Sequence, residues 1–213
     1  MTKFWLTKMI ALVATATLVS ACGGSDDPVP PGNLAEVAQQ QGFTALVAAA
    51  TKANLVTALS SPTANLTVLA PTDAAFTTLA TQLGFSSATA MVNALPADAL
   101  ASILSYHVLP ARRSAAQVIA GGASQPTIYT FSGQAATLAV STTGGVKFGD
   151  AVLTQAAVTT ADVPASNGVI HVIDKVLVPP GVLTIVQMAQ ANPAAFSTLV
   201  GAVVAADLAG ALG

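Results

Sequence analysis

The sequence predicts an α+β fold, in which helices from the first half pack on a sheet built mainly by the second half. Apolar residues recur at helical spacing between residues 34 and 107, whereas short β-rich segments separated by glycine-bearing turns fill residues 127–178. Helices segregated from strands in this way favour α+β over an alternating parallel α/β fold. Hydrophobic residues make up 53% of the 213 residues and charged residues 8%. This composition excludes a disordered chain, which would be poor in apolar residues.

The first predicted elements are a helix pair and a short strand. Apolar residues at helical spacing run from Leu34 to Ala50 and continue to Leu59, with Gly42 as the break between the two helices. Residues 66–70 (Leu-Thr-Val-Leu-Ala) then form a short predicted strand that is followed by Pro71. Because proline cannot donate to a strand ladder, we expect the strand to end there.

Two further helices are expected before the strand-rich half. Thr72 can cap a helix whose first turn carries Asp73, close to the positive end of the helix dipole. We therefore interpret Asp73 as a helix-start residue and not as an acid catalyst. The other helix begins near Pro96, and its apolar face is formed by Leu100, Ile103, Leu104 and His107.

The second half contains six β-rich segments. Turns such as Ser132-Gly133 and Gly144-Gly145 separate them. The predicted strands are residues 127–131, 136–140, 146–148, 152–153, 156–163 and 169–178.

Charge and hydropathy exclude two classes of protein. Seven basic residues face nine acidic ones, so the chain has no basic field to hold a nucleic-acid backbone. After the first two dozen positions the apolar residues are dispersed and never form the run of roughly 20 that a spanning helix needs. We expect neither a nucleic-acid-binding protein nor an integral membrane protein.

The N-terminus has the pattern of an export signal. Lys3 and Lys8 precede an apolar stretch at residues 9–19, and Leu-Val-Ser-Ala-Cys at residues 18–22 resembles the lipobox of bacterial lipoproteins. The resemblance implies that residues 1–21 are a lipoprotein signal peptide and that Cys22 is the lipidation site. An unpaired thiol with an external partner or a reactive role is the alternative.

Residues 22–32 are predicted to form a flexible tether, because they are rich in glycine, proline and small polar residues. Position 23 is glycine. Aspartate at this position is associated with retention in the inner membrane of Gram-negative bacteria. The resemblance to lipoproteins therefore favours the outer membrane or the cell surface.

Three ordered blocks resemble the fasciclin domain family. They are TVLAPTDAAF at residues 67–76, Tyr106-His107, and NGVIHVIDKVL at residues 167–177. The resemblance covers roughly residues 33–180. It implies one domain of helices packed on a twisted β-wedge, outside the cell and associated with adhesion or matrix contacts.

The C-terminal segment resembles the start of the same domain. Residues 196–212 align without gaps on residues 43–59, with eight of 17 positions identical. We interpret residues 181–213 as the start of a second, incomplete fasciclin-like repeat. The alternative is a C-terminal helix pair that merely shares an alanine-rich composition.

No catalytic, cofactor or metal site is predicted. His107 and His171 are the only histidines, and neither has a second histidine or a cysteine at metal-ligand spacing. Nucleophile-elbow and phosphate-loop motifs are absent from the sequence, and the mature chain carries no dinucleotide-binding motif. An enzyme would need one of these histidines exposed beside a nucleophile or a carboxylate.

The candidate partner contacts are Tyr106, His107, Arg112 and Arg113. His107 is expected to be a buried, hydrogen-bonded residue at a helix-to-strand corner, whereas the fasciclin resemblance implies that the Tyr106-His107 region contacts a partner. Arg112 and Arg113 follow Pro110 on an expected loop. They can be simply solvated, or they can hold a carboxylate or a sulfated sugar.

The sequence therefore predicts a non-enzymatic, lipid-anchored surface protein without cofactors that mediates adhesion through a protein or glycan partner. Its only expected contact with the membrane is the lipid anchor, and exposed apolar residues after position 181 would favour self-association. The alternative function is a binding module for a small apolar ligand or lipid. That alternative requires an enclosed apolar pocket of several hundred Å³, whereas adhesion requires an exposed patch with a polar rim.

Overall fold

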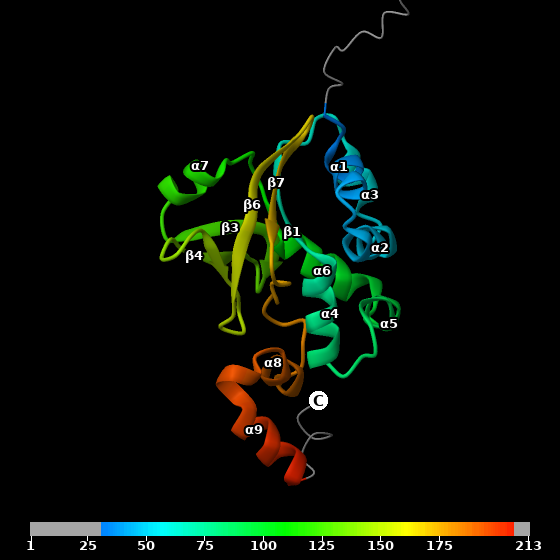
Figure 1. Ribbon diagram of the computed structural model, residues 1–213, viewed down its shortest axis with the longest axis vertical. Coiled ribbons are helices and arrows are strands. Elements are labelled where there is room, and N and C mark those ends of the chain that lie inside the picture. The colour runs from blue at the N-terminus through cyan, green and yellow to red at the C-terminus, as the bar shows by residue number, and fades with distance from the viewer. Residues whose placement is uncertain (1–30, 207–213) are drawn as a thin grey trace, which may run out of the picture.

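The computed structural model describes residues 31–206, and Figure 1 shows the arrangement of their helices and strands. The helices are α1 (Leu34–Gln40), α2 (Thr44–Lys52), α3 (Val56–Ser60), α4 (Asp73–Gln82), α5 (Ala88–Ala94), α6 (Ala97–Tyr106), α7 (Ala115–Ala120), α8 (Ile185–Ala191) and α9 (Pro193–Ala205). The strands are β1 (Leu66–Pro71), β2 (Val108–Leu109), β3 (Ser124–Phe131), β4 (Gln134–Ser141), β5 (Lys147–Gly149), β6 (Gln155–Ala165) and β7 (Gly168–Ile173).

The strands form one seven-stranded sheet in the order β2-β1-β7-β6-β5-β4-β3. Only β1 and β7 run parallel, with a register from Leu66 opposite Gly168 to Pro71 opposite Ile173, and the other neighbours are antiparallel. The two ends of the order, β2 and β3, also come close to each other. The sheet is therefore strongly curled, and the predicted α+β class with a wedge-shaped sheet is confirmed.

Strand β1 is buried on both faces. Val68 and Ala70 belong to a core cluster shared with the helices, whereas Leu69 points into a second cluster inside the curled sheet with Phe148, Ile173 and Leu177. Alternating side chains point to opposite faces of a strand, so two cores require apolar residues at every position. This explains the apolar residues at positions 68–71, and the one polar residue of β1, Thr67, is buried with its hydroxyl hydrogen-bonded.

Side-chain caps determine where several helices begin. Thr72 Oγ1 accepts the Ala75 N–H at 3.2 Å, and Pro96 immediately precedes α6, so both predicted helix starts are confirmed. Asp73 lies in the first turn of α4 as expected, and its carboxylate also accepts the Thr44 hydroxyl and the Ala45 N–H at the start of α2. Asp73 therefore lies at the start of α4 and also connects α4 to the start of α2.

Asn167 fastens the helices to the sheet. Its side chain is 3% exposed, accepts the Leu34 N–H at 2.8 Å, and donates to the carbonyls of Leu59 and Ser61, each at 2.8 Å. The N-terminus of α1 and the end of α3 are thereby held at the start of β7. Figure 1 shows α1, α2 and α3 along one flank of β1.

Two strand predictions are corrected. Residues 152–153 form a turn, in which the Asp150 carboxylate accepts the N–H groups of Val152 and Thr154 and the Leu153 backbone is left-handed, with φ of 62°. The strand expected at residues 169–178 ends at Ile173. Beyond it, the N–H groups of Leu177 and Val178 donate to the side chains of His107 and Asp150 instead of to a neighbouring strand.

The predicted helices also differ from those observed. The expected helix pair between residues 34 and 59 is three helices, because a second break with a left-handed backbone occurs at Asn54, where φ is 57°. Short helices α5 and α7 were not expected. Among residues 31–206 no single helix is long and apolar enough to cross a membrane; α5 and α6 pass that test only together, and they are bent by 117° at their break.

The C-terminal helices follow Gly181. Leu183 and Ala191 belong to the same core cluster as the helices of the main body, and Asn192 Nδ2 donates to the Val152 carbonyl at 2.9 Å. By contrast, Ile185 and Leu199 are exposed. The start of a second repeat at residue 181 stays a prediction, although α8 packs on the body that precedes it.

Candidate functional site

His107 lies directly after α6 and is 1% exposed. Its Nε2 accepts the Leu177 N–H at 2.9 Å, so the ring proton resides on Nδ1, which donates to the Ile103 carbonyl at 2.7 Å. Burial lowers the pKa of His107 to about 4, and the hydrogen bond to Ile103 opposes this only in part. His107 is therefore a neutral histidine that fixes the corner between α6 and β2.

Tyr106 is also interior, with 2% of its surface exposed. Its hydroxyl donates to the Thr137 carbonyl at 3.1 Å, and its ring meets that of Tyr129 edge-on, with 6.1 Å between the centroids. Burial, and secondarily the charge of Asp150, raise the pKa of Tyr106 to about 12. Since both Tyr106 and His107 are buried, the expectation that this pair offers direct partner contacts is not met by the folded surface.

The arginine pair lies on the loop between β2 and α7, as expected. The buried Thr67 hydroxyl holds this loop, because Oγ1 donates to the Ala111 carbonyl at 2.7 Å and accepts the Arg113 N–H at 2.8 Å. Arg113 is half-buried, and its guanidinium donates to Gln125 Oε1 at 3.0 Å. The exposed Arg112 makes only a long hydrogen bond of 3.4 Å to the Ala165 carbonyl. The loop thus presents Arg112 outward and turns Arg113 inward.

His171, on β7, holds this loop through a hydrogen bond. Its Nδ1 accepts the Asp162 N–H at 3.1 Å, and its Nε2 donates to the Arg113 carbonyl at 2.9 Å. Burial lowers the pKa of His171, with the Arg113 hydrogen bond and the Asp162 charge acting in the opposite direction. The neutral imidazole therefore joins the arginine loop to β6.

Arg112 opens onto a hollow of about 420 Å³, which we call the Arg112 hollow. Asp162 forms part of its wall, with a left-handed backbone (φ 59°) and a carboxylate that accepts the Ala115 N–H at 2.9 Å. Ser114 and Gln117 cap α7 reciprocally at the same place. The lining is Arg112, Ser114, Gln117, Asp162, Pro164 and Val169. A guanidinium, a carboxylate, an amide and a hydroxyl beside small apolar groups suit a polar ligand such as a sugar.

Of this hollow, only Arg112 was predicted. The Ser114-x-x-Gln117 pattern was a visible capping signal in the sequence, and the structure bears it out on α7. Asp162 carried no signal, because its approach to α7 depends on irregular pairing between β6 and β7.

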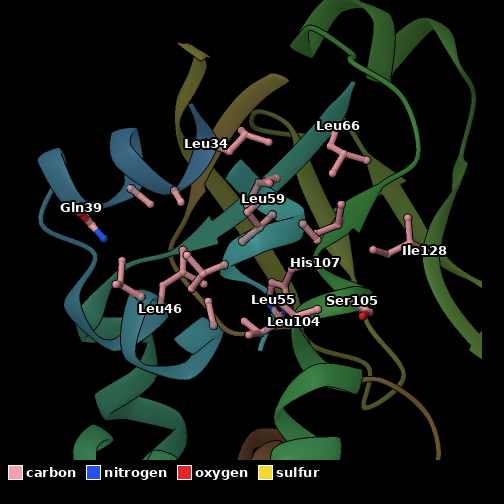
Figure 2. Close-up of a pocket in the computed structure, with 18 residues that line it drawn as sticks. Leu34, Gln39, Leu46, Leu55, Leu59, Leu66, Leu104, Ser105, His107 and Ile128 are labelled. Carbon is pink, nitrogen blue, oxygen red and sulfur yellow. The ribbon is translucent and has the colours of Figure 1, made fainter. Parts of the chain in front are cut away.

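An apolar cavity of about 70 Å³ lies between α1, α2 and α3 on one side and β1, α6 and β3 on the other. Figure 2 shows the leucines that dominate its wall, among them Leu34, Leu59 and Leu104. Gln39, Ser105 and His107 are its polar lining residues, and both ring nitrogens of His107 are already hydrogen-bonded. The cavity can therefore accept only a small and largely apolar group.

The described part of the chain holds no group of three or more His, Cys, Asp or Glu side chains that could bind a metal ion. Cys22, the candidate lipidation site, lies outside the described residues.

The model of the fasciclin domain family matches residues 41–179. The chain belongs to this family. Fasciclin domains are generally non-enzymatic, are typically extracellular or surface domains, and are associated with adhesion-type binding.

Two cyanobacterial proteins from Synechocystis sp. (strain ATCC 27184 / PCC 6803 / Kazusa) are similar to this fasciclin chain. Protein sll1483 is 41% identical over 145 residues, which cover 67% of this chain and 71% of that protein. The uncharacterized protein sll1735 is 36% identical over 146 residues, or 68% of this chain and 96% of its own length.

A solved structure of a FAS1 domain pair from the insect cell adhesion molecule fasciclin I matches 78% of this chain, with a TM-score of 0.39 and 19% identity. The match covers 50% of that insect chain.

Proposed function

We propose that this protein is an exported, lipid-anchored, non-enzymatic surface protein whose fasciclin domain mediates adhesion by binding a protein or glycan on a neighbouring cell or matrix. Its proposed location is the outer membrane or the cell surface, with the lipid on Cys22 and residues 22–32 as the tether.

The observation that carries the adhesive proposal is the Arg112 hollow. Adhesion needs an accessible surface with polar groups that can be satisfied by a partner. The guanidinium of Arg112 is exposed and its one internal hydrogen bond is long, so most of its donors are available to a ligand. The surrounding backbone is fixed by Thr67 and His171, so little ordering is needed on binding.

Substitution of Arg112 tests this proposal. Arg112→Ala should weaken attachment of protein-coated beads to the target cells or matrix by about tenfold, the loss expected for a charge-assisted hydrogen bond. Lys175→Ala removes an exposed cation elsewhere and is the matched control. Equal attachment of the wild type and Arg112→Ala, with unchanged folding, would refute the role of the hollow.

A second candidate function, binding of a small apolar ligand, is favoured by the cavity beside α1. At about 70 Å³ this cavity is well below the several hundred Å³ typical of ligand sites. It therefore ranks below the adhesive function.

The half-buried Ala35 lines this cavity, so Ala35→Leu should reduce its volume and lower the uptake of a small apolar probe such as xenon. Ala90→Leu places the same side chain at a half-buried position in the first turn of α5, away from the cavity, and should not. Uptake that is equal in both variants would exclude the cavity as the binding site.

A further inference from the structure

The Arg112 hollow holds hydrogen-bond donors that the protein uses only in part. Gln117 is exposed, and its Oε1 accepts the Ser114 N–H at 2.8 Å, so the two N–H donors on its Nε2 remain available. The Arg112 guanidinium has five N–H donors and uses one of them, in the 3.4 Å bond to the Ala165 carbonyl. Donors outnumber acceptors in the hollow, so its ligand needs an acceptor group, and the guanidinium favours one with a negative charge.

Asp162 supplies the opposite kind of group. Its Oδ1 accepts the Ala115 N–H at 2.9 Å, which leaves Oδ2 as an acceptor. The backbone N–H of Asp162 donates to His171 Nδ1 at 3.1 Å, so both the backbone and the side chain of this residue are held in place. Figure 1 shows α7, which begins at Ala115, beside β6, which contains Asp162. The ligand must therefore also carry a hydrogen-bond donor close to its anionic group.

The charges of the hollow favour a ligand with a single negative charge. Arg112 and Asp162 are the charged residues of the lining, and their formal charges cancel. The guanidinium of the neighbouring Arg113 is turned inward to Gln125 Oε1, at 3.0 Å. A densely sulfated glycan would therefore gain no net attraction here. A single carboxylate is planar and fits the guanidinium fork with two parallel hydrogen bonds.

A uronic acid residue of a polysaccharide meets these requirements on one ring. Its carboxylate can accept from Arg112 and Gln117 while a ring hydroxyl donates to Asp162, and its C–H groups can pack on the exposed Pro164. An acidic side chain of a protein fits less well, because it is flexible and carries no hydroxyl beside its carboxylate. The volume of about 420 Å³ lies within the range of roughly 300–1,000 Å³ that is typical of small-ligand sites.

We infer that the Arg112 hollow binds a uronic acid residue of an acidic polysaccharide, with the sugar carboxylate on Arg112 and Gln117 and a sugar hydroxyl on Asp162. The inference rests on the proposed function, because it names the ligand class of the same site. The partner in adhesion is then a polysaccharide that contains uronic acids.

Isothermal titration calorimetry of the purified protein tests the ligand class. The probes are the trisaccharides of galacturonate, glucuronate and mannuronate, each beside its methyl ester, which has no charged carboxylate. We expect at least one acid to bind, and its ester to bind at least about tenfold more weakly, since the ester cannot form the charge-assisted pair. Absence of binding by all three acids would overturn the inference, and so would equal binding of each acid and its ester.

Two variants test the placement of the ligand. Arg112→Lys keeps the charge but loses the planar fork, so it should weaken uronate binding at least about tenfold. Asp162→Asn removes the charged acceptor while asparagine tolerates the left-handed backbone, and it should weaken uronate binding by a similar factor. Asp98→Asn, at an exposed position in the first turn of α6, is the matched control and should bind like the wild type. Uronate binding that neither Arg112→Lys nor Asp162→Asn weakens would overturn the inference.

Two further probes test other classes of ligand. Sulfated maltotriose presents sulfates and hydroxyls without a carboxylate, and triglutamate presents carboxylates without hydroxyls. Both should bind the wild type more weakly than the preferred uronate does. Tighter binding of either probe that Arg112→Lys weakens would overturn the inference, because the hollow would then prefer a sulfated glycan or an acidic peptide.

Attachment of protein-coated beads separates this inference from the proposed function. Attachment that depends on Arg112, without binding of any uronate trisaccharide, would refute the uronate ligand and leave the adhesive function intact. Uronate binding that Arg112→Lys weakens, without attachment of the beads to uronate-containing polysaccharide or to cells, would refute the adhesive function alone.

Discussion

His107 Nε2 accepts the backbone N–H of Leu177 at 2.9 Å, across 70 residues of sequence. The next amide, that of Val178, donates to Asp150 Oδ2 at 3.0 Å. Two side chains thereby take the place of a strand partner for the segment after β7. This segment contributes Leu177 to the core inside the curled sheet. The side chains of His107 and Asp150 hold the segment in that position.

His107→Ala should lower the free energy of unfolding by about 1–3 kcal/mol, because it leaves the Leu177 N–H and the Ile103 carbonyl buried without partners. Thermal melting measures the loss. Lys175→Ala, at an exposed position two residues before Leu177, should change stability by no more than about 0.5 kcal/mol. Equal melting temperatures for His107→Ala and the wild type would show that the histidine is not structural.

Stability should fall on acidification. In the unfolded chain His107 titrates near pH 6.5, whereas burial lowers its pKa to about 4 in the folded protein. The unfolded state therefore binds the proton first, so stability is complete above about pH 6.5, declines down to about pH 4, and loses nothing further from this group below that. The difference between the two pKa values of His107 corresponds to a loss of folding stability of roughly 3 kcal/mol at most.

Two other groups also change the stability on acidification. Burial lowers the pKa of His171, which adds a further loss, whereas the raised pKa of Asp150 opposes the loss. His107→Asn keeps both groups, so its difference from the wild type isolates the contribution of His107. Urea unfolding between pH 7.5 and pH 4 should give a steeper decline for the wild type than for His107→Asn. Parallel profiles would contradict the assignment.

The sequence predicted the parts of the fold that depend on neighbouring residues. Thr72 as a helix cap and Ser132-Gly133 as a turn are local features, and both are observed. The Val152-Leu153 pair was predicted as a strand because both residues are apolar, but the Asp150 side chain captures the local N–H groups and forces a turn. Here a polar side chain overrides the β propensity of its neighbours.

The candidate site was less predictable, because its groups come from distant parts of the chain. Arg112 and Asp162 line the same hollow because β6 pairs with β7 and because His171 binds both the Asp162 N–H and the Arg113 carbonyl. The buried Tyr106 hydroxyl likewise donates to the Thr137 carbonyl, 31 residues away. No spacing within one segment encodes these contacts.

Thr67→Val should destabilise the arginine loop. The valine keeps the shape of the side chain but removes the hydroxyl, so the Ala111 carbonyl and the Arg113 N–H lose their partner, at a cost of about 1–3 kcal/mol. Hydrogen exchange of the Arg113 amide should quicken. Thr67→Ser retains the hydroxyl and should preserve the protection of this amide, and an equal effect of both variants would indicate packing alone.

Cys22→Ser should release the protein from membranes. If the lipobox functions, the mature wild-type protein carries a diacylglycerol on Cys22 and sediments with the membrane fraction, because buried acyl carbons supply the binding energy. Mass spectrometry of the mature N-terminus and membrane fractionation provide the measurement. Ser25→Ala alters the tether only and should remain membrane-bound. Unmodified wild-type protein in the soluble periplasm would disprove lipidation.

Two truncations test where the folded domain ends. If residues 181–213 belong to a separate second repeat, a chain ending at Gly181 should melt like the full chain. However, Leu183, Ala189 and Ala191 are 8%, 7% and 5% exposed. Their removal exposes the core that they cover, so we expect a loss of roughly 2–4 kcal/mol.

A chain ending at Asn192 keeps α8 and the hydrogen bond from Asn192 to Val152, and it lacks α9, on which Leu199 is 49% exposed, together with the residues after α9. Its melting temperature should therefore stay close to that of the full chain, measured at a dilution where both are monomeric. If the chain ending at Gly181 melts like the full chain, α8 is not part of the folded domain and a second unit begins at residue 181. If both truncations are equally destabilised, α9 belongs to the domain as well.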